Sequence, residues 1–260
     1  MSIIQGTGRG GAREFYDYPI EQSLRFDGTS SYLSRTPTTA GNRRTWTWSG
    51  WVKLAAIDSG GELFGVETVN GSTYTDIKIN NSNKIFLDSY GSTSELQARL
   101  YTNAVFRDTS AWYHIVGVLD TSNETASDRA IIYVNGVRQD ATISDGFSLS
   151  ANLMINTANE HRIGAHPLGN EGYLNGYLAN IQFIDGQALD ASYFGETKDD
   201  IWIPKTFDGT SSTGGSTVST DYGTNGFLLD FSSIDGTTII DTAPIATNHS
   251  SANNWTATGF

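Results

Sequence analysis

The most constraining feature of the sequence is segment 45–54, in which apolar and polar side chains alternate at every second position. The apolar set is Trp46, Trp48, Val52 and Leu54, and the polar set is Thr45, Thr47, Ser49 and Lys53. A period of two predicts a β-strand with one face on a core and the other toward solvent. Trp51 interrupts the polar face. We expect a tail or a neighbouring subunit, rather than a ligand, to cover it.

Turn signals divide the rest of the chain into similar short strands. Asn135-Gly136 is the strongest of them, because both residues accept the positive φ angles of a type I′ hairpin turn. Asp27-Gly28 and the run 80–83 mark two more turns. Only segment 188–194 suggests a helix, of a turn or two. Strands at this spacing predict an all-β fold, in which two antiparallel sheets pack as a jelly-roll sandwich.

The composition supports this fold class and excludes several functions. Thr, Ser and Asn occupy 75 of 260 positions, as expected for strands joined by turns. A net charge of −12 disfavours nucleic acid as a partner. The chain has no Cys, which removes disulfides and thiolate zinc sites. Because no apolar run approaches the roughly 20 residues of a membrane span, and no signal peptide is visible, we expect a chain that folds in the cytoplasm and does not insert into membranes.

Three regions follow from the patterning. Residues 1–22 read as an N-terminal arm, 23–204 as the jelly roll, and 205–260 as a Gly/Ser/Thr-rich linker and a C-terminal extension that packs on the sandwich or on a neighbour. Exposed aromatic side chains are costly to leave in water, so the arm is expected to dock on a partner surface. The residues proposed for this assembly role are Arg9, Arg13, Phe15, Tyr16 and Tyr18.

Six blocks resemble the laminin-G-like, concanavalin A-like jelly rolls in the family's order. They are Ser23–Leu33, Trp46–Lys53, Trp112–Asp120, Ile132–Gly136, Arg162–Gly164 and Leu174–Ile184. Each block alone is weak, but their common order is specific. The resemblance implies the two-sheet sandwich already expected from the strand pattern.

The C-terminal residues narrow this resemblance. Phe194–Glu196, Ile201–Lys205, Tyr222–Phe231 and Asn253–Thr256 are similar in layout to laminin-G-like structural proteins of marine tailed bacteriophages, although Ala246–Ala252 replaces their usual Gly/Asn-rich run. This implies a virion surface protein, either a head decoration or head fibre or a tail fibre component. Its partners would be other capsid or tail proteins and copies of itself, and it would assemble in the host cytoplasm.

Two further functions remain open. A lectin-like adhesin would bind host polysaccharide through aromatic platforms, and the candidates are Trp51, Tyr90, Tyr101 and Tyr173, with packing or a subunit interface as the alternative. A glycoside hydrolase needs paired carboxylates. The usual Glu-x-Asp-x-Glu pattern is missing, and Glu62 and Glu67 are predicted to lie on opposite faces of their strand. We therefore expect no enzyme.

No cofactor is required by the sequence. Laminin-G-like modules often hold a calcium ion, and the resemblance points to one acidic loop with Asp120, Asn123, Glu124 and Asp128, unless this loop is simply solvated. His161 and His166 lie near Glu160 and Glu171 but match no standard metal spacing, so they are expected to be surface histidines. For His114 we expect packing or a hydrogen bond.

Overall fold

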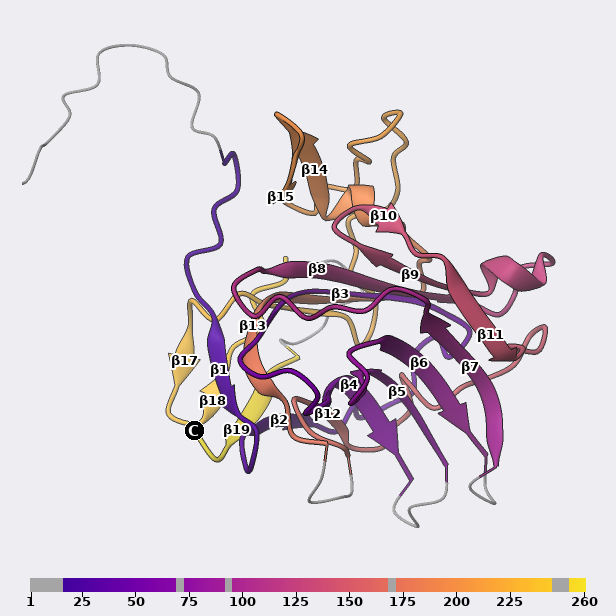
Figure 1. Cartoon of the computed structure of the whole chain (residues 1–260), viewed down its shortest axis with the longest axis horizontal. Coiled ribbons are helices and arrows are strands. Elements are labelled where there is room, and N and C mark those ends of the chain that lie inside the picture. Colours follow the sequence, from indigo (N-terminus) through magenta and orange to yellow (C-terminus); the bar gives the residue numbers. More distant parts are fainter. Residues whose placement is uncertain (1–15, 69–72, 92–94, 168–171, 245–252) are drawn as a thin grey trace, which may run out of the picture.

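The computed structural model describes residues 16–68, 73–91, 95–167, 172–244 and 253–260. It confirms the all-β fold, with two large antiparallel sheets packed as a jelly-roll sandwich (Figure 1). Two single-turn helices, Ala126–Asp128 and Ala191–Tyr193, are present, and the second falls within the predicted helical segment. Among the described residues, no helix combines the length and apolarity needed to cross a membrane.

The first sheet has seven strands. They are β1 (Leu24–Asp27), β3 (Thr45–Leu54), β8 (Tyr113–Asp120), β9 (Ala130–Val134), β10 (Val137–Arg138), β13 (Asn175–Asp185) and β16 (Phe227–Leu229). Their order is β1–β13–β3–β8–β9–β10, and β16 also pairs with β13. The Asn135-Gly136 turn between β9 and β10 has φ angles of +48° and +80°, which confirms the predicted hairpin.

The second sheet has ten strands. They are β2 (Tyr32–Arg35), β4 (Gly61–Glu67), β5 (Tyr74–Ile79), β6 (Ile85–Tyr90), β7 (Leu96–Thr102), β11 (Ala141–Asp145), β12 (His161–Ile163), β17 (Ile234–Asp235), β18 (Thr238–Ile239) and β19 (Trp255–Thr258). Their order is β11–β7–β6–β5–β4–β12–β2–β19–β18–β17. The strands β1 and β2 belong to different sheets, so the Asp27-Gly28 turn carries the chain from one sheet to the other.

The main core lies between the two sheets. The apolar face of β3 supplies Trp46 and Trp48, which are fully buried there as the alternation predicts. Trp255 of β19 enters the same core and packs against Phe64 and Phe227, with ring centroids 6.3 and 5.0 Å apart. The C-terminal residues therefore complete the sandwich core.

A second, smaller core covers the outer face of the first sheet. Residues 184–222 and the hairpin β14 (Gly195–Lys198) with β15 (Ile201–Pro204) lie over β8 and β9 (Figure 1). As a result Thr47 and Ser49 are 0% and 1% exposed. The expectation that the polar face of this strand meets solvent is therefore wrong, because the C-terminal part of the chain folds back across it.

A buried polar network fastens these C-terminal residues to the sandwich. The Asp185 carboxylate accepts hydrogen bonds from the Asn42 and Asn225 backbone N–H groups and from the Asn156 side chain. The Asn225 side chain donates to Asn156 Oδ1 at 2.8 Å and to Thr39 O at 2.9 Å. Because buried polar groups need partners, this network fixes where residues 222–226 can lie.

Candidate functional site

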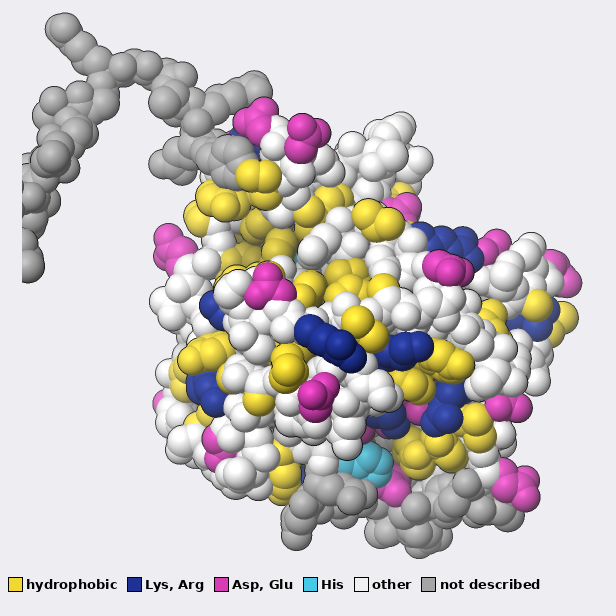
Figure 2. Space-filling model, in the orientation of Figure 1, with side chains coloured by type: hydrophobic (Ala, Val, Ile, Leu, Met, Phe, Trp, Pro, Cys, Tyr) yellow, Lys and Arg dark blue, Asp and Glu magenta, His cyan; other side chains and the backbone are white. Residues whose placement is uncertain are grey.

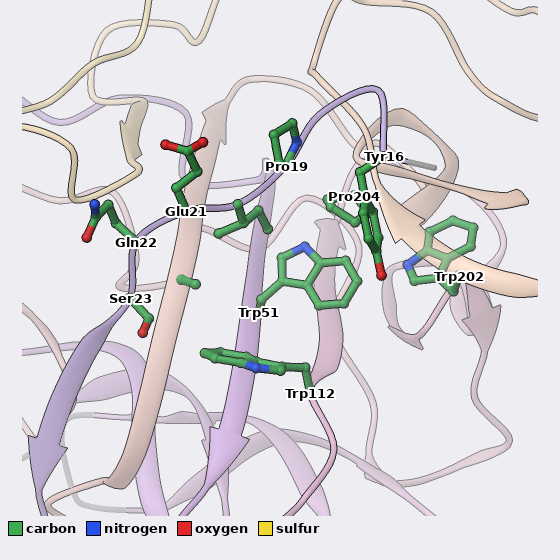
Figure 3. Close-up of a pocket in the computed structure, with 11 residues that line it drawn as sticks. Tyr16, Pro19, Glu21, Gln22, Ser23, Trp51, Trp112, Trp202 and Pro204 are labelled. Atoms are coloured by element: carbon green, nitrogen blue, oxygen red, sulfur yellow. The ribbon is translucent and has the colours of Figure 1, made fainter. Parts of the chain in front are cut away.

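The clearest concave site is a groove on the outer side of the first sheet, which we call the tryptophan groove. Four parts of the chain form it: the described arm with Ser23, β3 with the residue before β8, β13, and β15 (Figure 3). Its volume is about 430 Å³, and its apolar lining includes Tyr16, Ile20, Trp51, Trp112, Trp202 and Pro204. In Figure 2 hydrophobic side chains gather in the corresponding upper-left region.

Trp51 is held by an aromatic stack. Its ring lies on that of His114, with centroids 4.9 Å apart, and His114 in turn stacks on Trp202 at 5.9 Å. The Trp202 indole reaches this position because Gly136 and Gly195 leave room for it, and a Cβ at Gly136 would come within 2.5 Å of the ring. The aromatic side chain on the polar face of β3 is thus partly covered by the C-terminal region of the same chain.

Hydrogen bonds determine the protonation of His114. Trp202 Nε1 donates to His114 Nδ1 at 3.0 Å, so Nδ1 carries no proton. The other nitrogen, Nε2, lies 2.8 Å from Ser49 Oγ and is left to donate to it. Burial lowers the pKa of His114 to about 3, which keeps the ring neutral. The prediction of packing or a hydrogen bond for this histidine is confirmed, and both occur.

The arm supplies the polar rim of the groove. Glu21 and Gln22 line the groove beside Pro19, and Figure 3 shows their carboxylate and amide at the rim. Tyr16 is 46% exposed and lies across the groove from Trp51. Tyr18 is half-buried, close to Asp230 and hydrogen-bonded to the Asn180 side chain. Both described tyrosines of the arm therefore contact the chain's own sandwich, while Arg9, Arg13 and Phe15 lie outside the described residues.

The predicted sugar-binding residues do not form one site. Trp51 lies in the tryptophan groove, whereas Tyr90 and Tyr101 lie on the outer face of the second sheet, stacked on Tyr74 and Phe86 at 4.4 and 5.0 Å. Tyr173 is half-buried just before β13. Sequence reasoning did not identify Trp112 and Trp202 as companions of Trp51, because β8 and β15 meet β3 only through long-range folding.

The acidic loop does not gather its four predicted calcium ligands. Asp120 accepts hydrogen bonds from Ser122, and Asp128 pairs with Arg138 at 2.7 Å. The Arg129 guanidinium binds the carbonyl oxygens of Asn123 and Glu124, at 2.8 and 3.2 Å. Cationic side chains therefore already occupy several oxygens that calcium would need.

Two expectations about titratable groups are wrong. His161 is 3% exposed rather than on the surface: Asn156 N–H donates to its Nε2 at 2.9 Å, and its ring stacks on Phe64. Glu62 and Glu67 share one face of β4, because a β-bulge between Glu62 and Phe64 adds one residue and reverses the alternation. Neither feature leaves a local sequence signal.

Residues 27–192, well over half of the chain, match the family described as the concanavalin A-like lectin/glucanases superfamily, in its laminin G form. The chain belongs to this superfamily. No curated protein matches this chain.

Several solved structures are similar to this chain at low sequence identity. A heptameric SAP-like pentraxin from Limulus polyphemus is 18% identical, with 66% of this chain and 79% of that one covered and a TM-score of 0.47. Domains LG4-5 of the mouse laminin alpha1 chain are 13% identical, with 65% and 43% covered and a TM-score of 0.47. Domain 4 of a Geobacillus stearothermophilus arabinanase, in complex with arabinotriose, is 17% identical, with 70% and 79% covered and a TM-score of 0.46.

Proposed function

We propose that this superfamily member is a non-catalytic surface protein of a tailed bacteriophage particle, and that it contacts glycans through the tryptophan groove. The groove is the observation that carries the proposal. Sugar rings offer C–H faces that stack on aromatic side chains and hydroxyls that bond to amides and carboxylates. The groove presents Trp51 and Trp112 beside Glu21 and Gln22, which supply both kinds of contact.

The size and rigidity of the groove fit this role. Its volume of about 430 Å³ lies in the range of small-ligand pockets, roughly 300–1,000 Å³. The stack of Trp51, His114 and Trp202 fixes one wall before any ligand arrives. A fixed wall lowers the ordering cost of binding.

The virion role rests on the sequence resemblance and on the arm. The layout of residues 194–256 is similar to that of phage structural proteins, and the arm crosses one side of the sandwich before the first strand. A lectin-like adhesin without a particle is the alternative, and the same groove would serve it. The two roles differ in whether the protein is present in purified particles.

A non-catalytic role agrees with the burial and ion pairing of the carboxylates on the second sheet. Asp88, fully buried, pairs with Lys78 at 3.3 Å and with Arg99 at 2.8 Å. Glu62 and Asp76 are 3% and 0% exposed, whereas a hydrolase presents its carboxylate pair on both sides of the bound glycosidic bond. Catalysis by this group of carboxylates is therefore not proposed.

A glycan array tests the groove directly. Trp112→Ala removes a half-buried platform without touching the His114 stack, and we expect it to weaken binding at least tenfold while the protein stays folded. Tyr101→Ala is the matched control, because this aromatic residue lies on the opposite sheet. Loss of binding in Tyr101→Ala, with full binding in Trp112→Ala, would contradict the assignment to this groove.

Mass spectrometry of purified particles tests the virion role separately. Hundreds of copies per particle would indicate a head protein, and a few to tens would indicate the tail. Absence from particles, together with glycan binding by the isolated protein, would favour the free adhesin.

A further inference from the structure

A cluster of metal-ligating side chains lies away from the tryptophan groove, on the outer face of the second sheet. Glu62 on β4, Asp76 on β5 and His166 after β12 place one oxygen or nitrogen each within 4.8 Å of one another. We call these three residues the carboxylate–histidine cluster. Among the described residues this is the one such group of three or more acidic or histidine side chains.

The bulge in β4 creates the cluster. With the extra residue, Glu62 lies opposite Lys78 and Glu67 lies opposite Tyr74 on β5, so both glutamates emerge on the face that carries Asp76. Without the bulge, one of these glutamates would point into the apolar core. Bulges that redirect side chains in this way are common near functional sites.

Two buried carboxylate oxygens in the cluster lack a donor. Glu62 Oε2 and Asp76 Oδ1 receive no N–H or O–H donor among the described residues, although both side chains are at least 97% buried. A ligand oxygen of each of these two carboxyl groups lies within 4.8 Å of the other. Two such carboxylates can coexist only if a proton or a cation lies between them.

The surrounding charge favours a cation. The face carries four carboxylates, those of Glu62, Glu67, Asp76 and Asp88. Two cations pair with them, Lys78 at 2.9 Å from Asp76 and Arg99 at 2.8 Å from Asp88, while the nearby Arg162 pairs with Glu160 instead. A divalent ion would balance the excess negative charge.

The histidine is held in place by neighbouring side chains. The Tyr74 ring meets the His166 ring edge to face, with centroids 5.3 Å apart. Arg162 donates to the His166 carbonyl oxygen at 3.2 Å and is itself held by Glu160 at 2.8 Å. A hollow of about 450 Å³, lined by Gly61, Glu62, Lys78 and Gly172, gives access to Glu62 from solvent.

We propose that Glu62, Asp76 and His166 form a binding site for a divalent transition-metal ion of the zinc class. An imidazole nitrogen with two carboxylate oxygens suits zinc better than calcium, which prefers six or more oxygens. Ligand atoms about 2.0–2.2 Å from one ion lie roughly 3–4 Å apart, so the 4.8 Å limit requires only small side-chain movements. Solvent from the hollow would complete four-coordination.

Titration of the full chain, without a histidine tag, with zinc chloride and with calcium chloride tests the site. We expect one zinc ion per chain, bound at least tenfold more tightly than calcium. Binding of cobalt chloride should give the visible d–d absorption of an ion with nitrogen and oxygen ligands. The variant His166→Asn should weaken zinc binding at least tenfold and abolish the cobalt spectrum.

The control is Asp128→Asn, in the acidic loop whose side chain pairs with Arg138. Its zinc affinity should equal that of the wild type. Asp76→Asn is a second test that keeps the side-chain shape; if it fails to fold, His166→Asn decides alone, since that side chain is 17% exposed. No stoichiometric zinc binding, tighter binding of calcium, or unchanged zinc affinity in His166→Asn would each overturn the proposal.

Discussion

His114 connects three strands through one side chain. It projects from β8, bonds to Ser49 on β3 and accepts a hydrogen bond from Trp202 on β15. A protonated ring could no longer accept from Trp202, because both nitrogens would carry protons. The wall of the tryptophan groove therefore depends on a neutral histidine.

This dependence predicts a specific loss of stability in mild acid. The pKa of His114 is about 3 in the folded chain and about 6.5 when unfolded, so the unfolded state binds more protons between these values. Stability is complete above pH 6.5 and falls as the pH is lowered, by up to about 1.4 kcal/mol per pH unit for this residue. Urea unfolding from pH 7.5 to 5 should show a steeper slope in wild type than in His114→Gln. Equal slopes in the two proteins would contradict the conclusion that His114 is neutral in the folded chain.

Thr47 gives a second test at this scale. Its hydroxyl donates to Gln187 O and accepts from Leu189 N–H, both at 2.8 Å, in a fully buried position. Thr47→Ala leaves both groups unsatisfied, so we expect a loss of about 1–3 kcal/mol in unfolding free energy. Thr256→Ala, at an exposed site on β19, should cost less than about 0.5 kcal/mol. Denaturant unfolding measures both, and equal small losses would show that the second core does not cover β3.

At the scale of elements, the C-terminal strands are structural members of both sheets. The strand β16 pairs with β13, and β19 pairs with β2. Arg35 on β2 bonds to the side chains of Asn225 and Asn253, so polar contacts reinforce the pairing. The sandwich therefore depends on residues that follow the segment 205–226.

A chain ending at Pro204 should fail to fold cooperatively. It would lose Trp255 and Phe227 from the core and expose the edge of β2, which promotes aggregation. Circular dichroism melting and size-exclusion chromatography would detect both effects. As a control, two glycines inserted between Gly214 and Gly215 should leave the melting temperature unchanged, because a Cβ atom at either position would meet no other atom within 4 Å. A cooperative melt of the shortened chain near the wild-type temperature would contradict this.

The sequence predicted the elements whose signal is local. Alternation located β3, and Asn135-Gly136 located the β9–β10 hairpin. The strands β17 to β19 have two to four residues, too few for a periodic pattern, and Trp255 stands among polar neighbours. In the groove, the sequence showed that Trp51 interrupts a polar face. It did not show that Trp112 and Trp202 lie beside Trp51, because segments distant in the sequence bring these residues together. The bulge in β4 was also invisible, since its register is set by pairing with β5.

At the scale of the whole molecule, the arm and the groove are one feature. The described arm residues 16–22 form one side of the groove, and Tyr18 lies against Asn180 and Asp230. Whatever the preceding residues contact is therefore joined directly to the proposed glycan site. This arrangement makes attachment and glycan binding separable by truncation.

Two deletions should separate them. Without residues 1–15 the protein should keep its fold and its glycan binding but lose attachment to particles, as measured by co-sedimentation. Without residues 1–18 it should stay folded, because the first strand begins at Leu24, yet bind glycans more weakly since Tyr16 is missing from the groove. Wild-type attachment by both deletions would mean that the arm has no assembly role.

The position of β19 also governs the order in which the fold can form. This strand lies between β2 and β18, so residues 32–35, which pair with β12 on their other side, gain their second neighbour only after residues 255–258 have been synthesised. Pairings across so long a stretch of chain make folding slow, because the entropy of closing the loop is lost before the contacts form. On the ribosome, β2 would wait with one edge open through the synthesis of more than two hundred residues. The second sheet is therefore completed only late in the synthesis of the chain.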